Sequence, residues 1–84
     1  MGILETNIDT RIKQVTVNDE FLTVSLIDGR IISTPIAWYP SLFNADKKQR
    51  ENWDLAGGGY GIHWPDLDED LSVDGMLRGE KAHN

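Results

Sequence analysis

The chain contains no cysteine, and this absence removes several kinds of chemistry at once. Disulfides, thiol nucleophiles and thiolate metal sites are all excluded. A chain of 84 residues without such cross-links depends on its apolar core, because a domain of this size buries only about 60% of the surface that its unfolded chain exposes. We therefore expect one small globular domain.

Long hydrophobic runs are also missing. The apolar stretches span only a few residues each, so we expect no membrane-crossing segment and no membrane partner. The N-terminus lacks the basic start and the apolar run of a signal peptide. These two observations predict a cytoplasmic protein.

Basic residues are scarce, since eight Lys and Arg stand against 14 Asp and Glu and give a formal net charge of -6. Affinity for nucleic acid comes largely from cations that neutralise phosphates, so we expect no direct nucleic-acid binding. A basic protein partner suits this charge better, because opposite fields accelerate and orient docking. The alternative is that the acidic balance only keeps the protein soluble. A homo-oligomer also stays open.

Alternating apolar and polar residues predict a three-stranded antiparallel meander over residues 12–36. The clearest strand runs from Phe21 to Ile27. It is followed by Asp28-Gly29, a pair typical of a primed hairpin turn, because glycine accepts a positive φ. Pro35 places the end of the third strand near a sheet edge.

Short helices and a second β-hairpin are expected after the meander. Pro40 suits a first helical position, and Asp46 with Gln49 resembles a capping box. The glycine run at 57–59 permits a reversal within a hairpin over residues 53–64. Ser72 is expected to cap a short C-terminal helix that Gly79 ends.

These elements predict the α+β class and a single domain over residues 12–79. Residues 1–11 are expected to form a flexible or loosely docked N-terminus. Residues 80–84 are expected to be a disordered tail.

His63 is the first residue with a chemical signature. It lies between aromatic residues and precedes a run of carboxylates, a setting in which a histidine can be a general base. No serine or cysteine nucleophile motif accompanies it. We therefore expect a packed, hydrogen-bonded histidine and no catalytic residue, metal or cofactor.

The acidic run and the aromatic residues are the remaining candidates. The run fails the EF-hand spacing, which requires a glycine at the sixth position and a glutamate at the twelfth. Its carboxylates could instead stabilise the last helix or form a patch for a cationic partner. Among the aromatic residues, we expect Trp53 and Trp64 in the core and Trp38 and Tyr39 exposed. The candidate partner-binding residues are Trp38, Tyr39, His63, Trp64, Asp66, Asp68, Glu69 and Asp70.

Several segments together resemble a known family, domain of unknown function 2442. They are Asp28-Gly29-Arg30, Pro35-Ile36-Ala37-Trp38-Tyr39-Pro40, Gln49-Arg50-Glu51-Asn52-Trp53 and residues 61–73. The resemblance covers roughly residues 12–79. It implies a small bacterial α+β domain whose gene lies, in many relatives, beside that of another short protein, as in a toxin–antitoxin pair. Some relatives carry an added helix-turn-helix domain, which we do not expect in this chain, and the family offers no catalytic residues to transfer.

We therefore expect a non-catalytic protein-binding module, the antitoxin-like or adaptor member of a bacterial two-protein system. Its partner would be a basic protein encoded nearby. The alternative is a regulatory accessory of a nucleic-acid-binding complex or a transcriptional regulator. A small enzyme that uses His63 is a third hypothesis.

Overall fold

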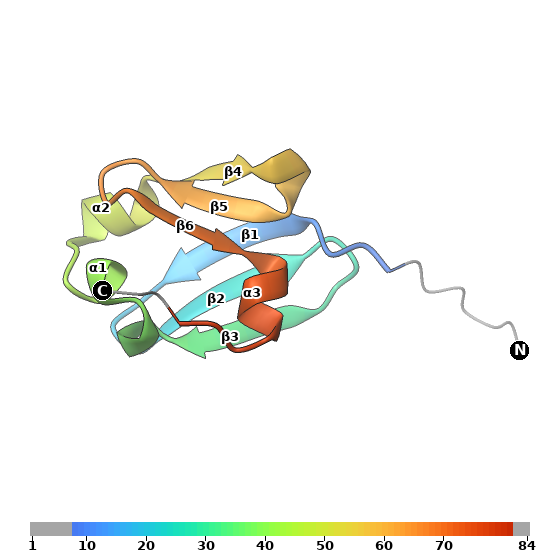
Figure 1. Ribbon diagram of the computed structural model, residues 1–84, viewed down its shortest axis with the longest axis horizontal. Coiled ribbons are helices and arrows are strands. Elements are labelled where there is room, and N and C mark those ends of the chain that lie inside the picture. The colour runs from blue at the N-terminus through green and yellow to red at the C-terminus, as the bar shows by residue number, and fades with distance from the viewer. Residues whose placement is uncertain (1–7, 82–84) are drawn as a thin grey trace, which may run out of the picture.

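The computed structural model describes residues 8–81. It contains two three-stranded antiparallel sheets, each a meander in chain order (Figure 1). The first sheet consists of β1 (Ile12–Val17), β2 (Phe21–Leu26) and β3 (Ile31–Pro35), and the second of β4 (Asp54–Ala56), β5 (Gly61–Trp64) and β6 (Glu69–Ser72). Along the chain, the two sheets are connected by a 3-10 turn, η1 (Ile36–Trp38), and by the helices α1 (Pro40–Phe43) and α2 (Lys47–Glu51). A glycine turn η2 (Gly57–Gly59) joins β4 to β5, and α3 (Val73–Leu77) follows β6.

The α+β class and the first meander are confirmed. The turn between β1 and β2 is built by Asn18, whose Oδ1 accepts hydrogen bonds from the backbone N–H groups of Glu20 and Phe21, both at 2.7 Å. Asparagine is favoured at such turns because its side chain bonds to the backbone a few residues on. A bulge in β1 between Ile12 and Gln14 shifts the register. It allows Ile12 and Val15, three residues apart, both to be buried.

The loop from β2 to β3 differs in detail from the prediction. Gly29 has a φ of +99°, as a hairpin glycine should, but no positive φ occurs at Asp28. Leu26 N donates to Arg30 O at 2.8 Å, so three residues form the loop. The turn is therefore a three-residue hairpin loop with a left-handed glycine and not a two-residue primed turn.

The second sheet contains one strand more than the sequence predicted. The expected hairpin of β4 and β5 is present, and β6 pairs with β5 in a further antiparallel ladder that includes Ile62 with Leu71 and Trp64 with Glu69. Acidic residues are poor strand formers, so the run at 68–70 gave no strand signal. Pairing with β5 overrides this local preference.

Apolar side chains from both sheets and from the connecting helices form one core. Trp64 and Tyr39 are its largest fully buried side chains. The other buried hydrophobic residues are Ile12, Val15, Leu22, Val24, Leu26, Ile36, Leu42, Ile62, Val73 and Met76. The prediction of a core position is confirmed for Trp64, and Trp53 packs partly buried against the same cluster.

Arg50 and Trp64 connect the two sheets to the helices. The side chain of Arg50 is only 11% exposed. Its guanidinium donates to the carbonyls of Leu42 and Phe43, each at 3.0 Å. It also donates to Asp19 Oδ1 at 2.8 Å. The Trp64 indole Nε1 in turn donates to Arg50 O at 3.1 Å.

Both predicted caps are present. Asp46 and Gln49 form a reciprocal capping box at α2, with Gln49 N donating to Asp46 Oδ1 at 2.8 Å. Ser72 Oγ accepts from Gly75 N at 3.0 Å at the start of α3. Gly79, with a φ of +77°, follows the helix end as predicted.

The ends of the chain are described in part. The predicted loose N-terminus falls mostly on residues 1–7, which lie outside the described residues. Residues 9 and 11 pair with the β2–β3 loop, because Ile27 N donates to Arg11 O and Asp28 N to Asp9 O. Residues 82–84 of the predicted tail also lie outside the described residues. Glu80 is placed against α3, since its N donates to Gly75 O at 2.9 Å.

Replacing Arg50 with methionine keeps the apolar stem but removes three hydrogen bonds. Two carbonyls at the end of α1 then lose the charged guanidinium donor, and Leu42 O keeps only its backbone donors, so we expect the free energy of unfolding to fall by about 2–4 kcal/mol. Urea denaturation measures this change. K48M, at an exposed lysine of the same helix, is the matched control and should change stability by less than about 0.5 kcal/mol. Equal effects of the two variants would contradict the assigned role of Arg50.

Asp28 should make stability depend on pH in the acid range. Hydrogen bonds from the Arg30 side chain, then from the backbone N–H groups of Arg30 and Asp9, lower the pKa of Asp28 from 3.8 to about 2. A lowered folded-state pKa stabilises the fold above the unfolded-state value, and this stability is lost as the pH falls from about 4 to about 2. D28N should flatten the pH dependence of the unfolding free energy in that window. An unchanged slope in D28N would show that Asp28 is not the responsible group.

Candidate binding cleft beside the sixth strand

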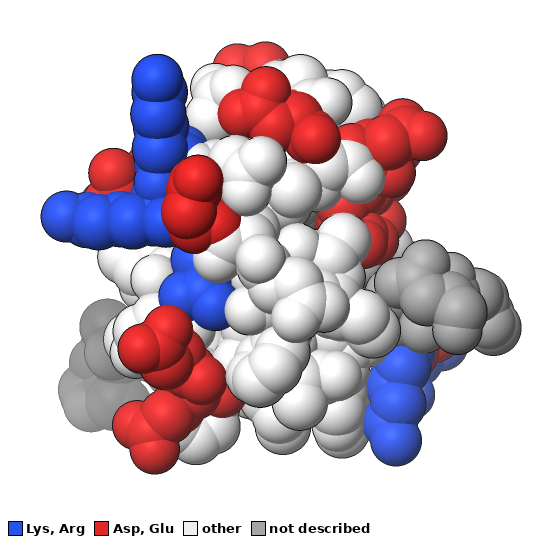
Figure 2. Space-filling model, turned by 90° about the vertical axis from the view of Figure 1, so that its left-hand side faces the viewer, with Lys and Arg blue, Asp and Glu red and all other residues white. Residues whose placement is uncertain are grey.

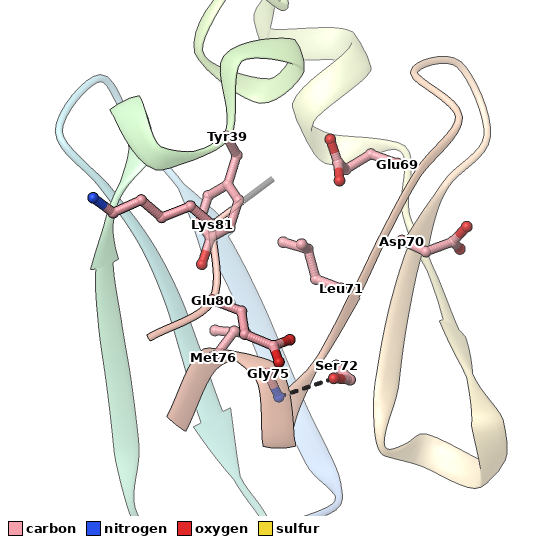
Figure 3. Close-up of a pocket in the computed structure, with 9 residues that line it drawn as sticks. All are labelled: Tyr39, Glu69, Asp70, Leu71, Ser72, Gly75, Met76, Glu80 and Lys81. Atoms are coloured by element: carbon pink, nitrogen blue, oxygen red, sulfur yellow. Dashed lines mark hydrogen bonds between the residues drawn. The ribbon is translucent and has the colours of Figure 1, made fainter. Parts of the chain in front are cut away.

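A cleft of about 410 Å³ lies between β6, α3 and the junction of η1 with α1 (Figure 3). Side chains on β6 alternate across the strand, so Glu69 and Leu71 point into the cleft while Asp70 and Ser72 point away from it. Met76 of α3 adds a second apolar side chain to the lining. The cleft therefore combines an apolar lining with a carboxylate.

Ser41 fixes the position of Glu69. Its Oγ donates a hydrogen bond to Glu69 Oε1 at 2.5 Å, which links α1 to β6 across 28 residues of sequence. A carboxylate oxygen can accept more than one hydrogen bond, and Glu69 has a second oxygen. Glu69 is therefore a positioned acceptor in the cleft.

Tyr39 contributes a buried hydroxyl. The residue is 0% exposed, so the predicted exposure of Tyr39 is wrong. Its backbone lies in the tight junction of η1 with α1, where Tyr39 N donates to Ile36 O and Phe43 N donates to Tyr39 O. This junction directs the ring inward, and its hydroxyl points into the cleft (Figure 3). Within residues 8–81, that hydroxyl has no hydrogen-bond partner.

A short C-terminal segment, Gly79–Lys81, passes over the cleft, and we call it the strap. Gly79 N donates to Met76 O and Glu80 N to Gly75 O, which is the Schellman pattern of helix ends. Glu80 packs closely on α3 at Gly75. The contact is so tight that any side chain at position 75 would clash with Glu80 where it lies, since a Cβ added to Gly75 would lie only 2.7 Å from Glu80 Oε1. The ammonium of Lys81 lies 4.9 Å from the ring centroid of Trp38, which is itself half-buried.

The predicted partner-binding residues do not all lie on one surface. Tyr39 and Glu69 point into the cleft, Asp70 borders it with its side chain turned away, and Trp38 lies at its strap. Trp64 is fully buried, so it cannot touch a partner from where it lies. Asp66 is exposed at the β5–β6 turn and accepts a hydrogen bond from Asn52 Nδ2 at 3.0 Å. Asp68 is exposed in the same turn with a φ of +50°, and it forms no ion pair within the described residues.

His63 lies on the opposite face of the second sheet from the buried Ile62 and Trp64. Its Nδ1 is 2.7 Å from Asp70 Oδ1, and the two residues are cross-strand partners. The hydrogen bonds of residues 8–81 include none between His63 and a serine, threonine or tyrosine hydroxyl. The pair is a half-exposed cross-strand contact, with 37% of the His63 side chain accessible.

Carboxylates also extend over the end of the molecule that carries α1 and α2. Figure 2 shows acidic side chains on both flanks of this end, on one flank mixed with Lys and Arg side chains, and a band of uncharged surface between the flanks. In the described part of the chain, no three His, Asp or Glu side chains converge as metal ligands. Nor does any described helix have the length and apolarity to cross a membrane.

Sequence reasoning missed four residues of this site. Leu71 was overlooked because β6 was not predicted, and the alternation along that strand is what turns Leu71 inward. Met76 lies on the predicted C-terminal helix, but only the packing of that helix places it in the cleft. Ser41 and Glu80 come close to the cleft only through tertiary contacts. Residues 28 positions apart, such as Ser41 and Glu69, leave no local pattern in the sequence.

Fold and cleft together define a small two-sheet α+β module with an acidic cleft. The chain belongs to the family described as "Protein of unknown function (DUF2442)", whose model matches residues 12–82. The resemblance noted in the sequence is thereby confirmed. No curated protein matches the chain.

Two solved structures are similar to it. One is the crystal structure of a protein of unknown function from Rhodospirillum rubrum, with a TM-score of 0.75 and 28% identity over 93% of this chain and 95% of that one. The other is the solution structure of an uncharacterized protein from Chromobacterium violaceum, with a TM-score of 0.72 and 19% identity over 87% and 69% of the two chains. The second likeness shows the fold alone.

His63 can be tested for a structural role. H63Q keeps a polar side chain on an outward face, so we expect the free energy of unfolding to change by less than about 0.5 kcal/mol. Urea denaturation of H63Q beside D70N measures this, and both variants should behave alike because they remove the same contact. If H63Q lowers the free energy of unfolding by well over 1 kcal/mol and D70N does not, His63 stabilises the fold through contacts other than the one with Asp70.

Proposed function

We propose that this protein is a non-catalytic binding module for a basic partner protein, as the antitoxin-like or adaptor member of a bacterial two-protein system. The observation that carries the proposal is the cleft beside β6, where Glu69 is held by Ser41 next to the apolar side chains of Leu71 and Met76. A patch of this kind suits a cationic side chain with an aliphatic stem. The antitoxin-like role rests on what the family resemblance implies.

The charge of the molecule supports the same proposal. The net charge of -6 favours association with a basic surface and disfavours phosphate-rich partners. Asp66, Asp68 and Asp70 are exposed along the β5–β6 hairpin that borders the cleft. Rim charges of this kind mainly raise the association rate and orient the partner.

Charge reversal tests the proposal. The tagged full chain is used to capture proteins from the cells in which it occurs, and the retained partner is quantified by mass spectrometry and then purified. D68K/D70K should lower the affinity for that partner at least tenfold, with a larger effect at low salt, where attraction is less screened. Titration calorimetry of the purified pair measures the difference.

A control variant distinguishes the effect of charge at the β5–β6 hairpin from the effect of the protein's total charge. Q14K/T16K/E20K produces the same total change in charge on exposed residues of β1 and the β1–β2 turn, far from the β5–β6 hairpin in sequence. It should retain most of the affinity. If both variants lose affinity equally, or if the retained protein is acidic, the proposed docking surface is wrong.

A further inference from the structure

The Tyr39 hydroxyl is the least expected feature of the cleft. It belongs to a fully buried residue, points into the cleft and has no hydrogen-bond partner within residues 8–81 (Figure 3). Buried tyrosine hydroxyls usually find a partner, because an unmade hydrogen bond leaves the group desolvated without compensation. A hydroxyl in this state is an acceptor and donor that is free for a ligand.

The groups around this hydroxyl favour a cation. Glu69 contributes a carboxylate that Ser41 holds in place. Glu80 contributes a second one from the strap, and one of its oxygens, Oε2, is already paired with the Arg78 guanidinium at 3.0 Å. One group opposes a cation, because Lys81 holds this chain's own ammonium 4.9 Å from the Trp38 ring centroid at the same strap. Leu71 and Met76 add apolar side chains to the lining of the same cleft.

We infer that the cleft receives an arginine side chain of the partner protein, an inference that rests on the proposed function. A guanidinium carries five N–H donors in a planar fork, so it can donate to a carboxylate and to a hydroxyl oxygen at once. In this cleft the guanidinium donates hydrogen bonds to Glu69 and to the Tyr39 hydroxyl, while the aliphatic part of the same arginine side chain lies against Leu71 and Met76. A lysine ammonium is a compact charge and meets this geometry less well.

Entry of the side chain requires the strap to move. The Tyr39 hydroxyl has no solvent-accessible surface while Gly79–Lys81 spans the cleft. The strap itself is exposed, and its backbone is joined to α3 by Gly79 N to Met76 O and Glu80 N to Gly75 O. Lys81 adds a positive charge near the entrance, so it disfavours a second cation there.

The test uses acetyl-arginine amide as a probe with the isotope-labelled full chain and follows amide shifts by NMR. We expect saturable shifts at β6 and α3 with a dissociation constant on the order of millimolar, as is usual for a ligand of this size. Acetyl-lysine amide should bind at least about fivefold more weakly. Acetyl-citrulline amide, which has the shape of arginine without its charge, should give no saturable shift.

Variants assign the contacts. Y39F should lower the affinity for acetyl-arginine amide about fivefold while the thermal midpoint stays equal or rises, because an unpartnered buried hydroxyl is removed. Y60F, at an exposed tyrosine, is the matched control and should change neither quantity. E69Q should weaken binding about tenfold, and K81A should strengthen it severalfold.

Three outcomes would overturn the inference. They are a probe that binds no better than its citrulline analogue, a Y39F variant that binds like the unmodified chain, and a Y39F variant whose thermal midpoint falls. If the probe fails while D68K/D70K still loses the captured partner, the proposed function stands and the arginine site falls. If the probe binds as expected but no basic partner is retained, the cleft still binds arginine and the proposed function is wrong.

Discussion

The contact between Trp64 and Arg50 joins the second sheet to the helices and to the turn of the first sheet. The indole lies fully buried in the second sheet and donates to the carbonyl of Arg50. The Arg50 guanidinium bonds to two carbonyls at the end of α1 and to Asp19 in the turn between β1 and β2. One residue thus ties three parts of the chain. A domain this small has few such residues to lose, because its core is close to the minimum for independent stability.

The same arrangement creates the cleft. With α1 fixed by Arg50, Ser41 reaches Glu69 on β6, and Tyr39 turns its ring inward beside α1. The hydroxyl at the end of that ring has no partner within residues 8–81, although every other large side chain of the core except Trp64 is purely apolar. A polar group retained at such a place is a cost to folding, and costs of this kind concentrate where proteins bind their ligands.

Acidic residues have more than one role in this protein. Asp28 and Asp46 build turns and caps, Asp19 anchors Arg50, and Asp70 pairs with His63 across two strands. Only part of the acidic excess is therefore available to a partner. The exposed carboxylates of the β5–β6 turn and the positioned Glu69 make up that part, which is why the proposed function rests on the cleft and its border and not on net charge alone.

Elements whose signals are local follow from the order of the amino acids alone. Alternation predicted the first meander, side-chain chemistry predicted the capping box at Asp46 and the caps of α3, and the missing cysteines excluded thiol chemistry, because each of these depends on neighbours a few residues apart. Tertiary structure alone decided the third strand of the second sheet, the burial of Tyr39 and the meeting of Ser41 with Glu69. These depend on pairing and packing between distant segments, and such contacts override local preference without leaving a periodic trace.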